Sequence, residues 1–174
     1  MKTIVLMAIS VDGFVAGAHD DTSFVSSTEW GAYFSLAKNC DAIIIGRKTY
    51  DVTSKKEFVS GVSYFVITHR APQTKKVPNA VFWHGSAKLL IQELRESGAK
   101  KILVAGGGQT NSLFLNEKLV DEIIVDVEGN LLEQGTKLFS RLVRKVDLKL
   151  LRVKKMGKNT VRLHYTVKKD FEKI

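Results

Sequence analysis

Three consecutive glycines, Gly106 to Gly108, constrain the fold of this chain more than any other feature of its sequence. They lie between an apolar run at 102–105 and a segment that we expect to be helical from about Asn111. Glycine loses more backbone freedom on folding than any other residue, so three in a row need a reason. A strand end, bare backbone amides and a helix N-terminus together form a typical phosphate-binding junction. The alternative is a tight turn between a strand and a helix.

Neither of the common nucleotide-binding patterns fits this chain. The dinucleotide pattern G-x-G-x-x-G would need a glycine at position 111, which is Asn111. The pattern G-x-x-x-x-G-K-[ST] is also absent, because Arg47 separates Gly46 from Lys48. A phosphate site built on the glycine triplet therefore belongs to neither of these folds.

Apolar runs alternate with amphipathic segments along most of the chain. We predict strands at 4–10, 42–45, 62–68, 80–83, 102–105 and 120–127, and helices that begin near 26, 47, 86 and 111. Strands separated by helices favour parallel pairing with right-handed crossovers. Two alternating strands joined at 156–159 predict a C-terminal hairpin, half-buried, which adds an antiparallel edge. The sequence thus predicts an α/β fold with one mostly parallel central sheet flanked by helices.

The composition is that of an ordinary globular domain. The chain has 174 residues, 44% of them hydrophobic, and we expect residues 1–174 to form a single domain. Cys40 is the only cysteine, which favours a reducing, cytoplasmic environment. The apolar run at 3–11 is too short to cross a bilayer, so we expect no membrane partner. The segment 12–27 is rich in glycine, aspartate and serine and is expected to be mobile.

Positive charge is concentrated at the C-terminal end. The net charge is +9, and residues 137–174 hold 13 lysines and arginines against three acidic residues. These cations alternate with apolar residues, which is typical of strands with solvated lysine-rich faces. We therefore expect no nucleic-acid partner. A non-catalytic binding module whose basic hairpin contacts a polyanion is the alternative.

Two further strand ends carry groups that suit an anion. Gly46, Arg47, Lys48 and Thr49 form a second strand-to-helix junction, which could hold a pyrophosphate together with the glycine triplet. The third strand ends in Thr68, His69 and Arg70, which suit a phosphomonoester such as the 2′-phosphate of NADP. The alternatives are unrelated turns with surface cations and a polar loop.

Taken in order, these motifs resemble the dihydrofolate-reductase-like superfamily. The closer likeness is to the reductase domain of bifunctional riboflavin-biosynthesis deaminase/reductases, and it covers roughly residues 3–167. The motifs that carry it are Ser10-x-Asp12-Gly13, Gly46-Arg47-Lys48-Thr49-Tyr50-Asp51, Ile67-Thr68-His69-Arg70, Val104 to Thr110, Leu119-Val120-Asp121-Glu122 and Gly135-Thr136-Lys137-Leu138-Phe139.

The resemblance implies an NADPH-dependent reductase that delivers a hydride to a small molecule. The substrate would be a pyrimidine- or pterin-like heterocycle or a ribosylaminopyrimidine, as for a 5-amino-6-(5-phosphoribosylamino)uracil reductase. The expected cofactor residues are Gly46, Arg47, Lys48, Thr49, Thr68, His69, Arg70, Gly106, Gly107, Gly108, Gln109 and Thr110. A dihydrofolate reductase is the alternative within this class, and the likeness also implies a homodimer.

Two carboxylates are candidates for catalysis, and each has a structural alternative. Glu29 lies where dihydrofolate reductases carry a substrate-facing acid, but Ser26-x-x-Glu29 is also a capping box. Asp12 either contacts the substrate or shapes the turn with Gly13. Phe14 stands where riboflavin reductases commonly carry a lysine after Asp-Gly. We expect no metal ligands.

Overall fold

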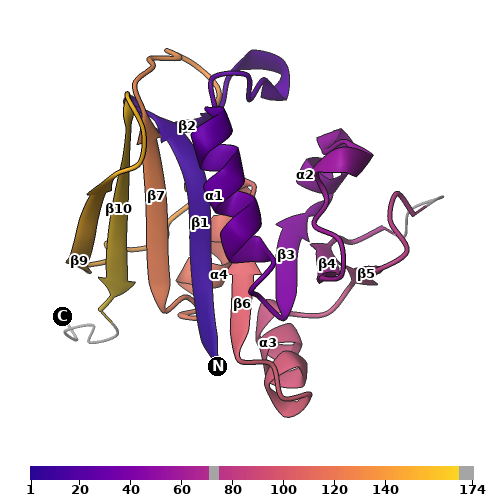
Figure 1. Cartoon of the computed structure of the whole chain (residues 1–174). Helices are drawn as coiled ribbons and strands as arrows, with labels where there is room; N and C mark the ends of the chain where they lie inside the picture. The colour runs from indigo at the N-terminus through magenta and orange to yellow at the C-terminus, as the bar shows by residue number, and fades with distance from the viewer. Residues whose placement is uncertain (71–74, 169–174) are drawn as a thin grey trace.

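A computed structural model describes residues 1–70 and 75–168 of the chain (Figure 1). Eight strands form one sheet in the order β5-β4-β3-β6-β1-β7-β10-β9. These strands are β1 (Lys2–Ser10), β3 (Ala42–Gly46), β4 (Ser63–Ile67), β5 (Ala80–Trp83), β6 (Lys101–Val104), β7 (Glu122–Glu128), β9 (Leu148–Lys155) and β10 (Thr160–Val167). The helices are α1 (Ser27–Ala37), α2 (Arg47–Val52), α3 (Ala87–Glu96) and α4 (Gly108–Asn116), with two 3-10 turns at Ala18–Asp20 and Lys55–Glu57.

Strand pairing confirms the predicted sheet. The six strands from β5 to β7 are parallel to their neighbours, whereas β10 runs antiparallel to β7 and β9 antiparallel to β10. The carboxyl ends of β1, β3, β4 and β6 therefore meet at one edge of the sheet, where the polar turns follow them. This is the edge at which open α/β sheets bind ligands.

Helices cover both faces of the central parallel strands, which explains why a strand such as β3 is apolar at nearly every position. In β3, Ile43 and Ile45 pack into the core on the side of α1, and Ile44 packs into the core on the side of α3 and α4. Figure 1 shows α1 crossing one face of the sheet, with α4 behind it. No helix within residues 1–70 and 75–168 is long and apolar enough to cross a membrane.

The structure differs from the sequence prediction in three places. Part of the segment expected to be mobile forms β2 (Phe14–Ala16), which pairs with β8 (Thr136–Lys137) in a small second sheet. Two- and three-residue strands are too short to show alternation, and their partner lies far away in sequence. The helix expected from about Asn111 begins at Gly108. The expected half-burial of the hairpin holds for β10 but not for β9, because every residue of β9 is exposed.

Candidate functional site

The two glycine junctions meet at the carboxyl edge of the sheet. β3 and β6 are parallel neighbours, and the amide of Gly46 donates a 2.7 Å hydrogen bond to the carbonyl of Gly106. A Cβ atom at Gly46 would lie 2.5 Å from Oγ1 of Thr110, closer than real side chains approach. A side chain at position 46 would therefore need the Thr110 hydroxyl of α4 to move aside.

Each glycine of the triplet has its own surroundings. Gly106 has a φ of +89°, which side chains rarely adopt. A Cβ at Gly108 would lie 2.2 Å from the carbonyl oxygen of Lys137, so this turn passes against β8. A Cβ at Gly107 would lie 3.3 Å from Oγ1 of Thr49, in the other junction. The triplet thus passes between β8 and α2. The backbone conformation of Gly106 and the close contact at Gly108 explain why glycine occupies these two positions without any ligand.

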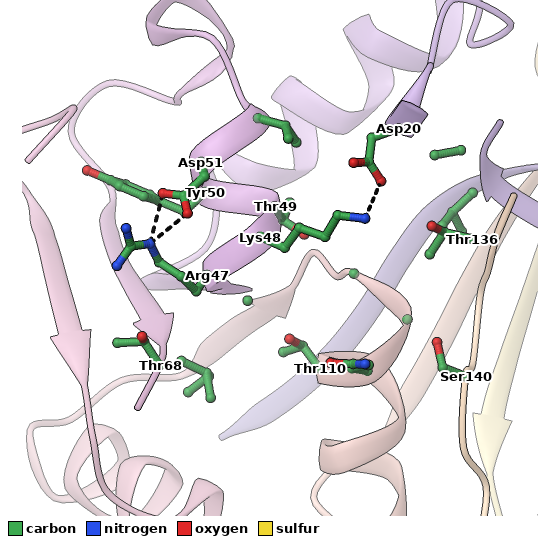
Figure 2. Close-up of a pocket in the computed structure, with 18 of the residues that line it drawn as sticks. Asp20, Arg47, Lys48, Thr49, Tyr50, Asp51, Thr68, Thr110, Thr136 and Ser140 are labelled. Carbon is green, nitrogen blue, oxygen red and sulfur yellow. Dashed lines mark hydrogen bonds and ion pairs between the residues drawn. The ribbon is translucent and has the colours of Figure 1, made fainter. Parts of the chain in front are cut away.

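A cleft of about 1350 Å³ opens at these turns (Figure 2). It extends from the end of β4 past α2 and the start of α4 to β8. All the predicted cofactor residues except Gly106 line it: Gly46, Arg47, Lys48, Thr49, Thr68, His69, Arg70, Gly107, Gly108, Gln109 and Thr110. The structure therefore brings three separate turns of the chain together around one cavity.

Basic groups outnumber acidic groups in the cleft. Its basic residues are Arg47, Lys48, His69, Arg70, Lys76 and Lys137, and its acidic residues are Asp20 and Asp51. Both acidic residues form ion pairs with α2: Asp51 with Arg47 at 2.8 Å and Asp20 with Lys48 at 2.9 Å. The cleft as a whole favours an anionic ligand.

Hydrogen bonds fix the turn that follows β4. The hydroxyl of Thr68 accepts from the amide of Arg70 at 3.1 Å and donates to its carbonyl at 2.8 Å. The guanidinium of Arg47 donates to the same carbonyl at 3.4 Å. The side chain of Arg70 is exposed and makes no ion pair with any residue in the described part of the chain. This places an uncompensated cation at the β4 end of the cleft.

Glu29 lies outside the cleft lining, in the first turn of α1, and is buried with 3% of its surface exposed. One of the two hydrogen bonds of the predicted capping box is present. The hydroxyl of Ser26 accepts from the amide of Glu29 at 3.2 Å, but the amide of Ser26 donates to Glu128 at 3.0 Å, not to Glu29. The reciprocal bond of a capping box is therefore absent, because a carboxylate from β7 takes the place of the glutamate within the helix.

Glu29 belongs to a buried cluster of three carboxylates and one guanidinium. Arg162 on β10 donates to both oxygens of Asp126 on β7, and Thr160 donates to Glu128 at 2.6 Å. Among the described residues, Oε2 of Glu29 has no hydrogen-bond partner. Burial, with the nearby negative charge of Asp126, raises the pKa of Glu29 to about 8. The Glu29 carboxyl is therefore protonated at neutral pH.

The sequence analysis missed the partners of Glu29 in this cluster. Asp126, Glu128 and Arg162 sit in strands that otherwise read as apolar or alternating. Two carboxylates two residues apart in one strand face the same side of the sheet, and this spacing is the signal that could have found them.

Asp12 holds a loop rather than facing the cleft. Its carboxylate accepts from the hydroxyl of Ser10 at 2.5 Å and from the amides of Leu132 and Glu133. The hydrogen bond from Ser10 does most to lower the pKa of Asp12, and the amides of Glu133 and Leu132 act in the same direction. These contacts fit the alternative in which Asp12 shapes the turn. The catalytic roles of Asp12 and Glu29 stay predictions.

One side of the cleft is lined by residues for which no role was predicted. They come from β1, β2, β8 and the loops around them: Met7, Val15, Ala16, Asp20, Thr22, Gly135, Thr136, Lys137 and Ser140. The motif Gly135-Thr136-Lys137 was recognised without a function. Its position in the cleft depends on the pairing of β8 with β2, which local sequence patterns do not reveal.

Two Bacillus subtilis proteins are similar to this chain over nearly its whole length. The uncharacterized protein YwjB is 26% identical over 170 residues, which cover 94% of this chain and 97% of that protein. The uncharacterized protein YyaP is 21% identical over 178 residues, which cover 94% of each.

Solved structures share the fold. A putative riboflavin biosynthesis protein from Shewanella sp. PV-4 has a TM-score of 0.80 at 21% identity, covering 97% of this chain and all of that one. A pyrimidine reductase-like protein from Corynebacterium diphtheriae has a TM-score of 0.77 at 13% identity, covering 97% and 92%. RibD from Acinetobacter baumannii has a TM-score of 0.76 at 20% identity, covering 96% of this chain and 58% of that one. These likenesses confirm the fold expected from the resemblance.

The family comparison agrees with the fold. The model of the RibD C-terminal domain matches residues 51–162, well over half of the chain. The matched region runs from the end of α2 through the glycine triplet to β10, and so includes most of the cleft and the partners of Glu29. On this evidence the chain belongs to the RibD C-terminal domain family.

Proposed function

We propose that this protein is an NADPH-dependent reductase of the riboflavin-biosynthesis type, acting on a pyrimidine-like heterocycle. The observation that carries the proposal is the convergence of three polar turns, after β3, β4 and β6, on one basic cleft. Family membership supports the same activity. A Thermotoga maritima protein with this fold is described as a diaminohydroxyphosphoribosylaminopyrimidine deaminase/5-amino-6-(5-phosphoribosylamino)uracil reductase, and this chain covers 56% of its length.

The cleft fits a dinucleotide in size and chemistry. Its volume of about 1350 Å³ exceeds the typical range of roughly 300–1000 Å³ for smaller ligands. Gly46 and Gly107 bring backbone, without side chains, to the middle of the cleft, where a pyrophosphate would lie. Lys48 and Arg47 flank that position with positive charge.

Preference for NADPH over NADH would depend on the turn after β4. Arg70 makes no ion pair among the described residues, and Thr68 fixes its backbone through two hydrogen bonds. A guanidinium can bind a phosphomonoester through two hydrogen bonds, and charge-assisted bonds of this kind contribute about 1.5–3 kcal/mol. We therefore assign Arg70, with His69 beside it, to the adenosine 2′-phosphate.

A nicotinamide bound in the cleft would supply the hydride. The protein must position the substrate and provide a proton. Glu29 is the candidate acid, because its carboxyl is protonated at neutral pH. It is buried in the first turn of α1 and does not line the cleft, so a catalytic role requires α1 to move or a relay through neighbouring groups. Asp12 would act by holding the loop at Leu132 and Glu133.

Titration with NADPH and NADH tests the proposal. We expect fluorescence quenching and a rise in Tm with NADPH, and binding of NADH at least tenfold weaker (about 1.4 kcal/mol). Arg70→Ala should remove most of this difference, whereas Arg95→Ala, an exposed arginine on α3, should leave it unchanged. Absence of any response to either nucleotide would exclude the proposal. Equal affinity in the wild-type chain would exclude only the role of Arg70.

Turnover assays separate the remaining functions. Reduction of the ribosylaminopyrimidine by NADPH is expected, and turnover of dihydrofolate that is lost in Glu29→Gln would instead favour a dihydrofolate reductase. The polyanion-binding module predicts oligonucleotide affinity that falls steeply with salt. We propose that the chain has no such affinity, because the cations of β9 alternate with leucines on a solvated strand.

We also propose that the protein forms a homodimer through the β9–β10 hairpin. Three apolar residues of β9 lie on one face of the hairpin, and each is at least 39% exposed: Leu148, Leu150 and Val153. Exposed apolar patches of this kind commonly mark interfaces. Sedimentation analysis of Leu150→Glu should give a monomer where the wild-type chain gives a dimer. A monomeric wild-type chain would contradict the proposal.

A further inference from the structure

Asp20 places a carboxylate of the protein inside the cleft that we assign to the cofactor. It ends the 3-10 turn Ala18–Asp20, between β2 and α1, and it lines the cleft. Its Oδ1 lies 2.9 Å from Nζ of Lys48, the second residue of α2. Figure 2 shows the Lys48 side chain extending across the cleft toward Asp20. The pair thus joins two segments that are distant in sequence.

The turn that carries Asp20 adopts an unfavourable backbone. His19 and Asp20 have φ values of 56° and 61°, in the left-handed region that side chains other than glycine disfavour. Hydrogen bonds from Gly17 to Asp21 and from Asp21 to Ala18 close the turn. Among the described residues, Lys48 is the only side-chain partner of Asp20. Among the described residues, this ion pair is the only hydrogen bond or ion pair of the Asp20 side chain, and it links the strained turn to α2.

A ligand can easily replace Asp20 as the partner of Lys48. The side chain of Lys48 is 77% exposed and that of Asp20 is 25% exposed, and ion pairs at such positions contribute little net stability. A phosphate group carries more negative charge than a carboxylate and accepts stronger hydrogen bonds from a lysine. An anionic ligand in the cleft will therefore compete with Asp20 for the same ammonium group.

The second ion pair of the cleft, between Arg47 and Asp51, does not connect two separate segments of the chain. Asp51 and Arg47 lie in the same helix, four residues apart, so this ion pair does not itself join two segments, although Arg47 also donates to the carbonyl of Arg70. Separation of Asp20 from Lys48 releases the connection between the strained turn and α2. Of the two ion pairs in the described part of the cleft, the Asp20 pair is the one that joins separate segments.

We infer that Asp20 is a resident anion that occupies Lys48 when the cleft is empty and is displaced when a polyphosphate binds. Its displacement frees residues 17–21 from α2. Asp20 therefore lowers the affinity of the cleft for its ligand and couples binding to the loop between β2 and α1. This inference rests on the proposed function, because it assigns the cleft to a phosphorylated ligand.

Inorganic pyrophosphate tests the competition without the nicotinamide. We expect Asp20→Asn to bind pyrophosphate about three- to tenfold more tightly than the wild-type chain in calorimetric titration. Asp21→Asn is the charge-matched control, because Asp21 accepts hydrogen bonds from Ser23 and not from Lys48. Its affinity should stay within twofold of wild type. Equal gains in both variants would indicate long-range electrostatics and overturn the inference.

A double-mutant cycle and hydrogen exchange complete the test. The gain from Asp20→Asn should vanish in a Lys48→Met background, and a persistent gain contradicts direct competition. Pyrophosphate should speed exchange of the Gly17 and Asp21 amides in the wild-type chain, and in Asp20→Asn this exchange should already be fast. Unchanged or slower exchange would overturn the displacement. If pyrophosphate binds as described but NADPH does not, the proposed function fails while the competition stands.

Discussion

Asp126 on β7 accepts two hydrogen bonds from the guanidinium of Arg162 on β10, at 2.7 and 2.5 Å. The carboxylate is fully buried, so this pairing is what makes its charge tolerable there. Glu29 on α1 packs against the same group and stays protonated. A guanidinium and a protonated carboxyl thus lie buried where α1 packs on the sheet, beside the apolar contacts of Tyr33 and Ala37.

Arg162→Gln should destabilise the protein by about 3–5 kcal/mol, because it leaves the buried charge of Asp126 without its partner. Urea denaturation measures this free energy. Arg152→Gln is the matched control on neighbouring β9, where the side chain is exposed, and it should change stability by less than about 0.5 kcal/mol. Similar losses in the two variants would show that the Asp126 pair has no special role.

Glu29→Gln should change how stability depends on pH. The pKa of Glu29 is about 8 in the folded chain against an ordinary 4.5, so the folded state holds an extra proton between these values. The contribution of Glu29 to the free energy of unfolding is fully present below about pH 4.5 and is lost as the pH rises through 8. The wild-type chain should lose on the order of a few kcal/mol relative to the variant over this window.

Denaturation curves between pH 5 and pH 9 measure that difference. Glu93→Gln, which removes an exposed carboxylate from α3, serves as the control and should follow the wild-type curve. If the wild-type and Glu29→Gln curves run parallel across this range, Glu29 does not retain its proton.

Gly46→Ala should disrupt the meeting of the two junctions. The new Cβ would lie 2.5 Å from Oγ1 of Thr110, and overpacking of this kind typically costs about 1–3 kcal/mol. We expect a lower Tm and weaker binding of NADPH, with partial rescue by Thr110→Ala. Gly31→Ala on α1 meets no atom within 4 Å and should stabilise the chain by about 0.5–1 kcal/mol. A neutral Gly46→Ala would contradict the close approach.

Lys137→Ala should weaken the binding of a phosphorylated substrate. Lys137 pairs directly with Phe14 between β8 and β2, lines the cleft and makes no ion pair among the described residues. It thus places a cation beside the position where riboflavin reductases commonly carry a lysine. We expect KM for the ribosylaminopyrimidine to rise about tenfold, or 1.4 kcal/mol, with KM for NADPH unchanged. Lys149→Ala on β9 is the charge-matched control, and an equal rise there would contradict the prediction.

The sequence by itself determined the parallel part of the sheet and the turns that line the cleft. Strands such as 42–45 are apolar at every position because helices cover both faces, and that pattern is visible locally. The turns after β3, β4 and β6 were found because glycine and polar residues at strand ends are visible locally, and their order along the chain resembles a known family. Parallel pairing then places all three turns at one edge of the sheet.

Only the tertiary structure decided the surroundings of Glu29 and the second side of the cleft. The motif Ser26-x-x-Glu29 predicts a capping box, but Glu128 competes for the same amide from another strand. The β2–β8 pair brings residues 14–16 and 136–137 together, and so adds Lys137 to the cleft. Local patterns report propensity and periodicity. They carry no information on which distant side chain completes a hydrogen bond, because that choice depends on how the packed elements meet.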